Sequence, residues 1–125
     1  MSTRFFADLH IHSRYSIACS KSITPESLAF SAACKGLHVL GTGDCIHPAW
    51  KTELQRDLVA AGNGLFRLND KKSGRVIQQL PSSCRQEVQF LLSTEISTIY
   101  KRDGRTRKVH HLVCLPDFAS AGDRK

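Results

Sequence analysis

The chain has 125 residues, about the size of one domain and enough to bury a hydrophobic core. Hydrophobic residues make up 41% of it and charged residues 23%, which excludes a disordered, collagen-like or coiled-coil protein. Lys and Arg number 18 against 11 acidic residues, a net charge of +7 that fits either a polyanionic partner such as nucleic acid or a solvated basic surface.

The apolar runs and the cysteines indicate the compartment. No apolar run reaches the roughly 18–20 residues that cross a bilayer, and residues 1–12 lack the apolar stretch of a secretory signal. The cysteine count of 5 is odd and includes no CxxC pair, so neither a disulfide framework nor a zinc ribbon is expected. We therefore expect a cytoplasmic protein with no membrane partner.

The first third of the sequence predicts a strand, a helix and a second strand. Residues 5–12 are rich in apolar side chains and predict a buried strand, which a polar loop follows. Thr24 and Pro25 then suit a helix start, and Gly36 suits the end of that helix. Residues 37–40 predict the second strand. This order predicts a right-handed crossover and a parallel sheet, and therefore an α/β fold.

The remaining elements are a helix, an irregular stretch and a hairpin. Pro48 opens a helix that is expected to run through Ala60, and residues 61–82 read as a long surface excursion. Residues 88–100 and 107–115 predict strands, and Asp-Gly at 103–104 is a strong signal for a hairpin between them. The tail from Ala119 to Lys125 is small and polar and is expected to fray.

Two histidines on the first strand form the first candidate metal-binding segment. Side chains alternate along a strand, so His10 and His12 point the same way, about 7 Å apart, and Asp8 shares their face. Two imidazoles and a carboxylate suit a transition metal. An HxH pair also arises by chance on half-exposed strands, so this segment alone decides nothing.

The second segment follows the second strand. Asp44 could supply an oxygen ligand and His47 a nitrogen, at the strand end where α/β folds place their sites. Either residue could instead cap the helix opened by Pro48. We expect Cys45 to face the core and Trp50 to pack there. His38, on the approach to the strand, is interpreted as structural.

The third segment lies on the hairpin. If residues 103–104 form the loop, Ser97 faces His110, and Glu95 and His110 lie on one face as diagonal neighbours. His111 then falls on the other face; a loop of three residues would reverse this parity. We therefore prefer His110 to His111. A carboxylate on so apolar a strand needs a partner.

Three segments that each combine histidine with a nearby carboxylate predict a polynuclear metal site with nitrogen and oxygen ligands. Residues 7–13 (ADLHIHS) resemble the first motif of the polymerase and histidinol phosphatase (PHP) superfamily. Residues 41–44 (GTGD), 95–97 (EIS) and 109–112 (VHHL) resemble its later motifs, in the order of that family. The resemblance spans nearly the whole chain. Residues 44–50 and 64–68 are most similar to the endonuclease Q branch.

The resemblance implies the N-terminal part of a distorted (β/α)7 barrel with a β-hairpin arm, so residues 1–125 would form a partial PHP metallophosphoesterase domain. It implies divalent ions (Zn, Mn or Mg), up to three in a complete site. The ligands it implies, which are also the catalytic residues, are His10, His12, Asp44, Glu95 and His110, with His47 as a further candidate. Cys45 departs from the Asp-His pair of many members. The later ligands of the family have no counterpart after Pro116, so a C-terminal half or a partner chain is expected to be missing.

Endonucleases of the Q branch nick DNA on the 5′ side of deaminated bases, and this DNA repair activity is the leading hypothesis. Two basic segments are expected to contact the DNA backbone: Arg67, Lys71, Lys72 and Arg75, and then Lys101, Arg102, Arg105, Arg107 and Lys108. The second hypothesis is a small-molecule phosphatase of the histidinol phosphatase kind. The third is a catalytically incomplete fragment that binds DNA without cleaving it.

Overall fold

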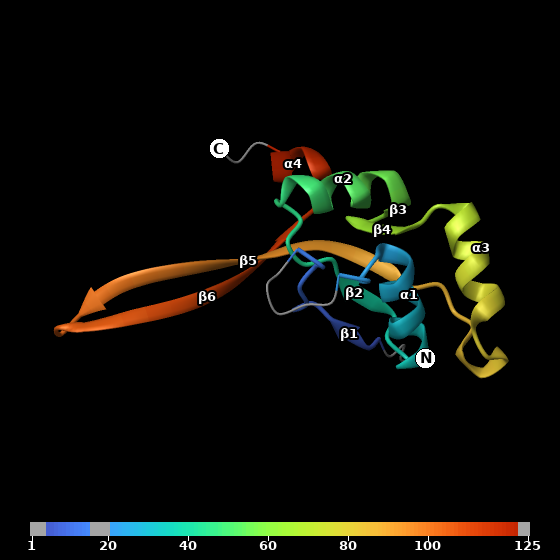
Figure 1. The fold of residues 1–125 in the computed structure, drawn as a ribbon, viewed down its shortest axis with the longest axis horizontal. Helices are drawn as coiled ribbons and strands as arrows, with labels where there is room; N and C mark the ends of the chain where they lie inside the picture. The colour runs from blue at the N-terminus through green and yellow to red at the C-terminus, as the bar shows by residue number, and fades with distance from the viewer. Residues whose placement is uncertain (1–4, 16–20, 123–125) are drawn as a thin grey trace.

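A computed structural model describes residues 5–15 and 21–122 of the chain (Figure 1). Its mixed sheet has the strand order β1-β2-β5-β4-β3, where β1 is Ala7–Asp8, β2 is Val39–Gly41 and β5 is Gln89–Arg102. Strands β1, β2 and β5 run parallel to one another, whereas β4 (Leu65–Leu68) pairs with β5 in the antiparallel direction and β3 (Leu58–Gly62) pairs antiparallel with β4. The predicted α/β class and the parallel strand–helix–strand unit are confirmed.

Helix α1 (Pro25–Cys34) connects β1 to β2 and starts where the sequence predicts. The Thr24 hydroxyl accepts a hydrogen bond from the Ser27 amide, and the Ser27 hydroxyl accepts one from the Thr24 amide. These two bonds satisfy amides that the first turn of a helix leaves unpaired. Pro25 at the first helical position has no amide hydrogen to leave unpaired.

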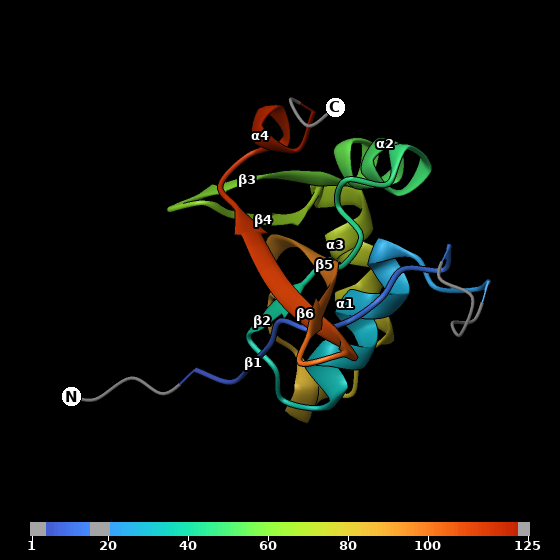
Figure 2. The ribbon, with the colours of Figure 1, turned by 90° about the vertical axis from the view of Figure 1, so that its left-hand side faces the viewer.

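The core lies between the sheet and the helices. Phe90 and Leu92 of the central strand β5 are fully buried, as are Trp50 and Leu54 of α2 (Pro48–Asp57). Helices α1 and α3 (Asp70–Gln79) lie on one side of the sheet (Figure 2). Three small residues of α1 are buried, which lets that helix approach closely: Ala29, Ala32 and Ala33.

Strand β5 leaves the sheet and continues as one side of a long hairpin with β6 (Arg105–Leu115). The hairpin projects from the body of the molecule (Figure 1). Asp103 and Gly104 form its turn at φ angles of 54° and 72°. Positive φ at both central residues belongs to the type I′ turn, for which Asp-Gly is a preferred pair.

Four sequence expectations are wrong. Strand β1 ends at Asp8, because the carbonyl of Leu9 accepts a hydrogen bond from the Ser93 hydroxyl rather than from a neighbouring strand. Helix α2 ends at Asp57, three residues before the expected end. The expected excursion at residues 61–82 instead contains the β3–β4 hairpin, α3 and a short 3-10 turn, Ser82–Cys84.

The fourth concerns the tail. Phe118–Gly122 form a short helix, α4, whose Phe118 ring lies 5.0 Å from that of Phe66; residues 123–125 lie outside the described part. None of the helices in the described ranges is both long and apolar enough to cross a membrane.

Candidate metal centre

Two glycines at the end of β2 bring the first histidine segment against the sheet. A Cβ atom at Gly41 would collide with the carbonyl of Leu9, and one at Gly43 would collide with the carbonyl of Ile11. The buried hydroxyl of Ser93 joins the same segments, because it accepts from the Gly43 amide at 3.0 Å and donates to Leu9. The segment with both histidines therefore packs directly on the end of β2.

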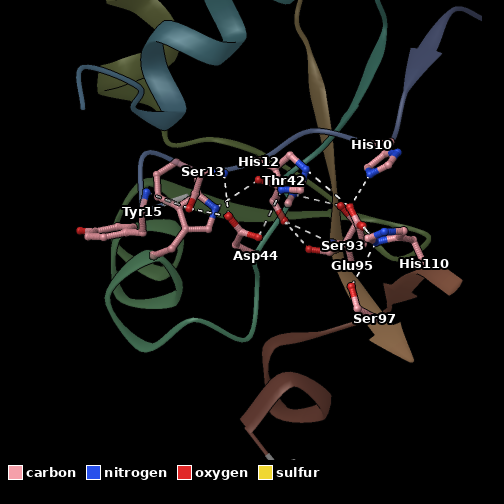
Figure 3. Close-up of polar contacts among 12 residues, drawn as sticks. His10, His12, Ser13, Tyr15, Thr42, Asp44, Ser93, Glu95, Ser97 and His110 are labelled. Atoms are coloured by element: carbon pink, nitrogen blue, oxygen red, sulfur yellow. Dashed lines mark hydrogen bonds and ion pairs between the residues drawn. The ribbon is translucent and has the colours of Figure 1, made fainter. Parts of the chain in front are cut away.

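His10, His12 and Glu95 form a group whose candidate ligand atoms all lie within 4.8 Å of one another (Figure 3). The Oε2 atom of Glu95 lies 2.6 Å from Nε2 of His10 and 3.5 Å from Nε2 of His12. The Glu95 side chain is 16% exposed, whereas that of His10 is 56% exposed. The carboxylate is thus held at the floor of the group, and the imidazoles border solvent.

His110 contacts the second oxygen of the same carboxylate. Its Nδ1 forms a close ion pair with Oε1 of Glu95 and lies 3.1 Å from the hydroxyl of Ser97. The observed register pairs Ser97 with His110 and Ile96 with His111, which confirms the predicted hairpin parity. Glu95 therefore has imidazoles at both of its oxygens, and His111 lies on the opposite face of the hairpin.

Asp44 lies on the other side of His12. Its Oδ2 accepts hydrogen bonds from the amide and the hydroxyl of Ser13, at 2.8 and 2.7 Å. Its Oδ1 is 3.8 Å from Nδ1 of His12. Asp8 is not part of this arrangement: its carboxylate accepts from the backbone amide of His10. The carboxylate expected beside the two histidines thus comes from Glu95, with Asp44 on the far side of His12.

Other residues near the centre have structural partners. Nδ1 of His47 accepts from the Trp50 amide at the start of α2, and its ring stacks on Tyr15 at 4.6 Å. The expectation that Trp50 packs in the core is confirmed, and its indole nitrogen donates to the carbonyl of Thr42. Nδ1 of His38 accepts from the Phe6 amide, in agreement with its structural interpretation.

Two titrating groups differ in the physical cause of their pKa shifts. The hydrogen bond from His10 holds the pKa of Glu95 below its ordinary value; partial desolvation opposes this, and the charge of His110 supports it. Burial raises the pKa of the Cys45 thiol to about 11. Glu95 is therefore an ionised carboxylate at neutral pH, and Cys45 is a protonated core residue, as expected from the sequence.

An open hollow of about 350 Å³ adjoins the centre. Its lining includes the carboxylates of Asp44 and Glu95 and the rings of Tyr15 and His47. Ser13, Tyr15 and Ser93 were not singled out as site residues from the sequence. The neighbouring HxH motif was the one signal for Ser13 and Tyr15, and nothing in the sequence signalled Ser93.

The two basic segments differ in their partners. Arg67 pairs with Asp70, Arg75 with Glu26, and Lys72 with Asp57. The five cations of the hairpin have no ion-pair partner within the described residues: Lys101, Arg102, Arg105, Arg107 and Lys108. The hairpin, more than α3, thus presents unneutralised positive charge.

Comparison with known proteins places this arrangement in context. No family model matches the chain. It is 33% identical over 104 residues, 80% of its length, to an uncharacterized protein of Methanocaldococcus jannaschii, and covers 13% of that protein. The lesion-specific endonuclease PfuEndoQ of Pyrococcus furiosus matches 94% of the chain with a TM-score of 0.66 and 30% identity.

Endonuclease Q in complex with a 27-mer duplex carrying an abasic lesion at the active site matches with a TM-score of 0.65 and 30% identity. The chain spans 23% and 24% of these two structures, about a quarter of each. Its fold is therefore similar to one part of endonuclease Q.

Proposed function

We propose that the chain is the metal-binding part of a DNA endonuclease of the endonuclease Q type, which hydrolyses the phosphodiester 5′ of a deaminated base. The observation that carries this proposal is the group of His10, His12 and Glu95. The chain that holds this group matches endonuclease Q over 94% of the chain's own length, with 30% identity. The partial PHP barrel expected from the sequence belongs to the same proposal.

The donor set fits divalent metal ions. Imidazole nitrogens and carboxylate oxygens are ligands for Zn and Mn, and carboxylates for Mg. His10, His12, Asp44, Glu95 and His110 would hold the ions. His47 could add only its Nε2, because its Nδ1 caps α2. A bound divalent ion neutralises charge on phosphoryl oxygens and lowers the pKa of a water molecule.

The chain's own residues prepare the centre for that chemistry. Ser13 holds Asp44 through two hydrogen bonds, so the orientation of this carboxylate is set before substrate arrives. Glu95 is ionised and lies between His10 and His110. The adjoining hollow leaves room for a substrate group beside both carboxylates. A damaged base in a duplex has to swing out of the stack to reach such a site.

The test is metal binding and cleavage measured on the same protein. We expect Mn or Zn to bind the chain and Glu95→Gln to weaken binding by at least about tenfold, because one charged ligand is lost. Cleavage is assayed on duplexes that contain deoxyinosine, deoxyuridine or an abasic site. Equal metal affinity for wild type and E95Q would contradict the proposed centre.

One observation favours a second function. The hairpin carries five cations that form no ion pair within the described residues, which suits a chain that binds DNA without cleaving it. Duplex binding without strand cleavage at saturating metal would favour this function. Hydrolysis of a small phosphomonoester in place of DNA would favour the phosphatase hypothesis.

A further inference from the structure

The outer part of the β5–β6 hairpin, residues 98–109, projects as an arm from the body of the molecule (Figure 1). Every residue of the arm is exposed except the half-buried Val109, and Ile99 is 67% exposed. From Glu95 to Arg102 strand β5 extends about 23 Å, at about 3.3 Å per residue. A two-stranded ribbon has little stability of its own in water. The arm therefore adds little to the core and is available to a partner.

Strand register divides the cations of the arm between its two faces. Ile99 pairs with Lys108, Tyr100 with Arg107, and Arg102 with Arg105. Because paired residues share a face and faces alternate along a strand, Lys101 and Lys108 lie on the face that carries Glu95. The opposite face carries Arg102, Arg105 and Arg107.

The five cations form no ion pair within the described residues. The one acid between Lys101 and Lys108 is the turn residue Asp103. The cations of β4 and α3 offer a contrast, because three of the four, Arg67, Lys72 and Arg75, are in ion pairs, and only Lys71 has none among the described residues. Because both faces of the thin ribbon carry unpaired cations, the arm is complementary to a polyanion that contacts both faces, rather than to one that lies against a single face.

We propose that the arm enters the major groove of duplex DNA as a two-stranded ribbon; this rests on the proposed function and extends it to the mode of DNA binding. The major groove is about 12 Å wide and admits a β-ribbon, whereas the minor groove is only about 6 Å wide. Phosphates line both walls of the groove, so the lysine face and the arginine face each meet one wall. Tyr100 lies on the arginine face and Thr106 on the lysine face, so each meets the same wall as the cations of its own face.

The length of the arm sets how far from the metal centre this contact lies. A strand of duplex DNA carries one phosphate per about 3.4 Å, so the roughly 23 Å from Glu95 to the tip corresponds to about seven base pairs. Contact with the whole arm therefore requires about seven base pairs of duplex on one side of the lesion.

Paired substitutions on the two faces test the proposal with the full chain. The variants are K101A/K108A for one face, R105A/R107A for the other, and the combination of all four. Affinity for a 27-mer duplex with a central abasic site is measured from low to moderate salt. Each pair should reduce the log–log salt slope by about 1.8, and the four together by about 3.6, because each lost phosphate contact removes about 0.9.

Two controls keep the comparison interpretable. K101R/K108R retains the charges and should keep the wild-type slope. Lys35→Ala removes an exposed cation at the C-terminus of α1, away from the arm, and should leave the slope unchanged. A slope that changes for only one of the two alanine pairs places the DNA against one face and overturns groove entry.

Chemical footprinting identifies the groove. Dimethyl sulfate modifies guanine N7 in the major groove and adenine N3 in the minor groove. Wild type should protect guanine N7 on one side of the lesion, and the fourfold variant should not. Protection of adenine N3, or no protection, overturns the proposal.

The two proposals can fail separately. Cleavage by wild type with unchanged binding by the arm variants would remove the groove assignment and leave the nuclease. Guanine protection by a chain that neither binds metal nor cleaves DNA would remove the nuclease proposal and leave the groove assignment. Absence of DNA binding by wild type at low salt would overturn both.

Discussion

At the scale of single residues, two glycines offer a matched test of how the centre is built. Gly43 has a φ of +63°, and a Cβ atom there would collide with the carbonyl of Ile11, whereas Gly74, inside α3, has open space at its Cβ position. Gly43→Ala should destabilise the chain by more than about 1 kcal/mol, because the new methyl group meets backbone in a strained conformation. Gly74→Ala should stabilise it by about 0.5–1 kcal/mol. Urea denaturation measures both, and equal effects would contradict the close approach.

The neighbouring histidines of β6 form the second test at this scale. His110 contacts Glu95, whereas His111 lies opposite Ile96 on the other face. His110→Ala should weaken metal binding by about ten- to a hundredfold, which is the usual effect of losing a metal ligand or a residue that holds a metal ligand in place. His111→Ala should change it less than about twofold. Titration with Mn or Zn gives both affinities, and a larger loss for H111A would reverse the assignment.

At the scale of elements, an ion pair joins α2 to α3. The Asp57 side chain is 2% exposed and lies 2.8 Å from the Lys72 ammonium and 2.9 Å from the Arg56 guanidinium. Asp57→Asn should cost about 1.5–3 kcal/mol of unfolding free energy at neutral pH, because charged hydrogen bonds are lost in a buried place. Asp70→Asn is the matched control: that carboxylate pairs with Arg67 but is 94% exposed, so less than about 1 kcal/mol should be lost.

The same pair has a defined pH dependence. Burial alone would raise the pKa of Asp57, but hydrogen bonds from Arg56 and Lys72 outweigh it and hold that pKa below its ordinary value. A carboxyl whose pKa is lower in the folded state stabilises the fold above its unfolded pKa of about 3.9, and this contribution disappears as the pH falls through the folded pKa. The stability difference between wild type and D57N should therefore shrink below about pH 4. A constant difference down to pH 2 would contradict this.

Local signals predicted some elements well and others not at all. The Thr24-Pro25 start of α1 and the Asp-Gly turn at 103–104 are both observed, because each depends on a few residues that are adjacent in the sequence. Asn63-Gly64 is the same kind of hairpin signal, yet the β3–β4 hairpin was not predicted, because the surrounding glycines and cations read as an irregular surface loop. Helix α3 depends on its Asn69 cap and its packing against α1, and the packing is a tertiary effect.

Some features of the candidate centre could likewise be predicted from the sequence, and others could not. Hairpin parity is a property of chain geometry, so the position of His110 on the face of Glu95 could be derived from residue numbers. The role of Ser93 could not, because it depends on a hydroxyl that reaches Gly43 and Leu9, residues far away in the sequence. The Asp44 side chain was foreseen as a candidate ligand, but its Ser13 partner was not.

At the scale of the whole molecule, the arm and the metal centre are separable parts of one hairpin. Deletion of residues 99–102 and 105–108 joins Thr98 to Val109 through Asp103 and Gly104. Thr98 and Val109 already pair with each other, and their pair has the same parity as the pair next to the natural turn, so the shortened hairpin keeps its register. The deleted residues are all exposed, so the melting temperature and the metal affinity should remain close to wild type.

Duplex affinity should instead fall steeply in this shortened chain, because all five hairpin cations are removed while Glu95 and His110 remain. At about 0.9 per phosphate contact, the log–log salt slope can decrease by up to about 4.5. Calorimetric melting, metal titration and duplex binding on the same preparation separate the three properties. Loss of metal binding together with DNA binding would mean that the arm supports the geometry of the centre, because Glu95 and His110 depend on pairing further along the two strands.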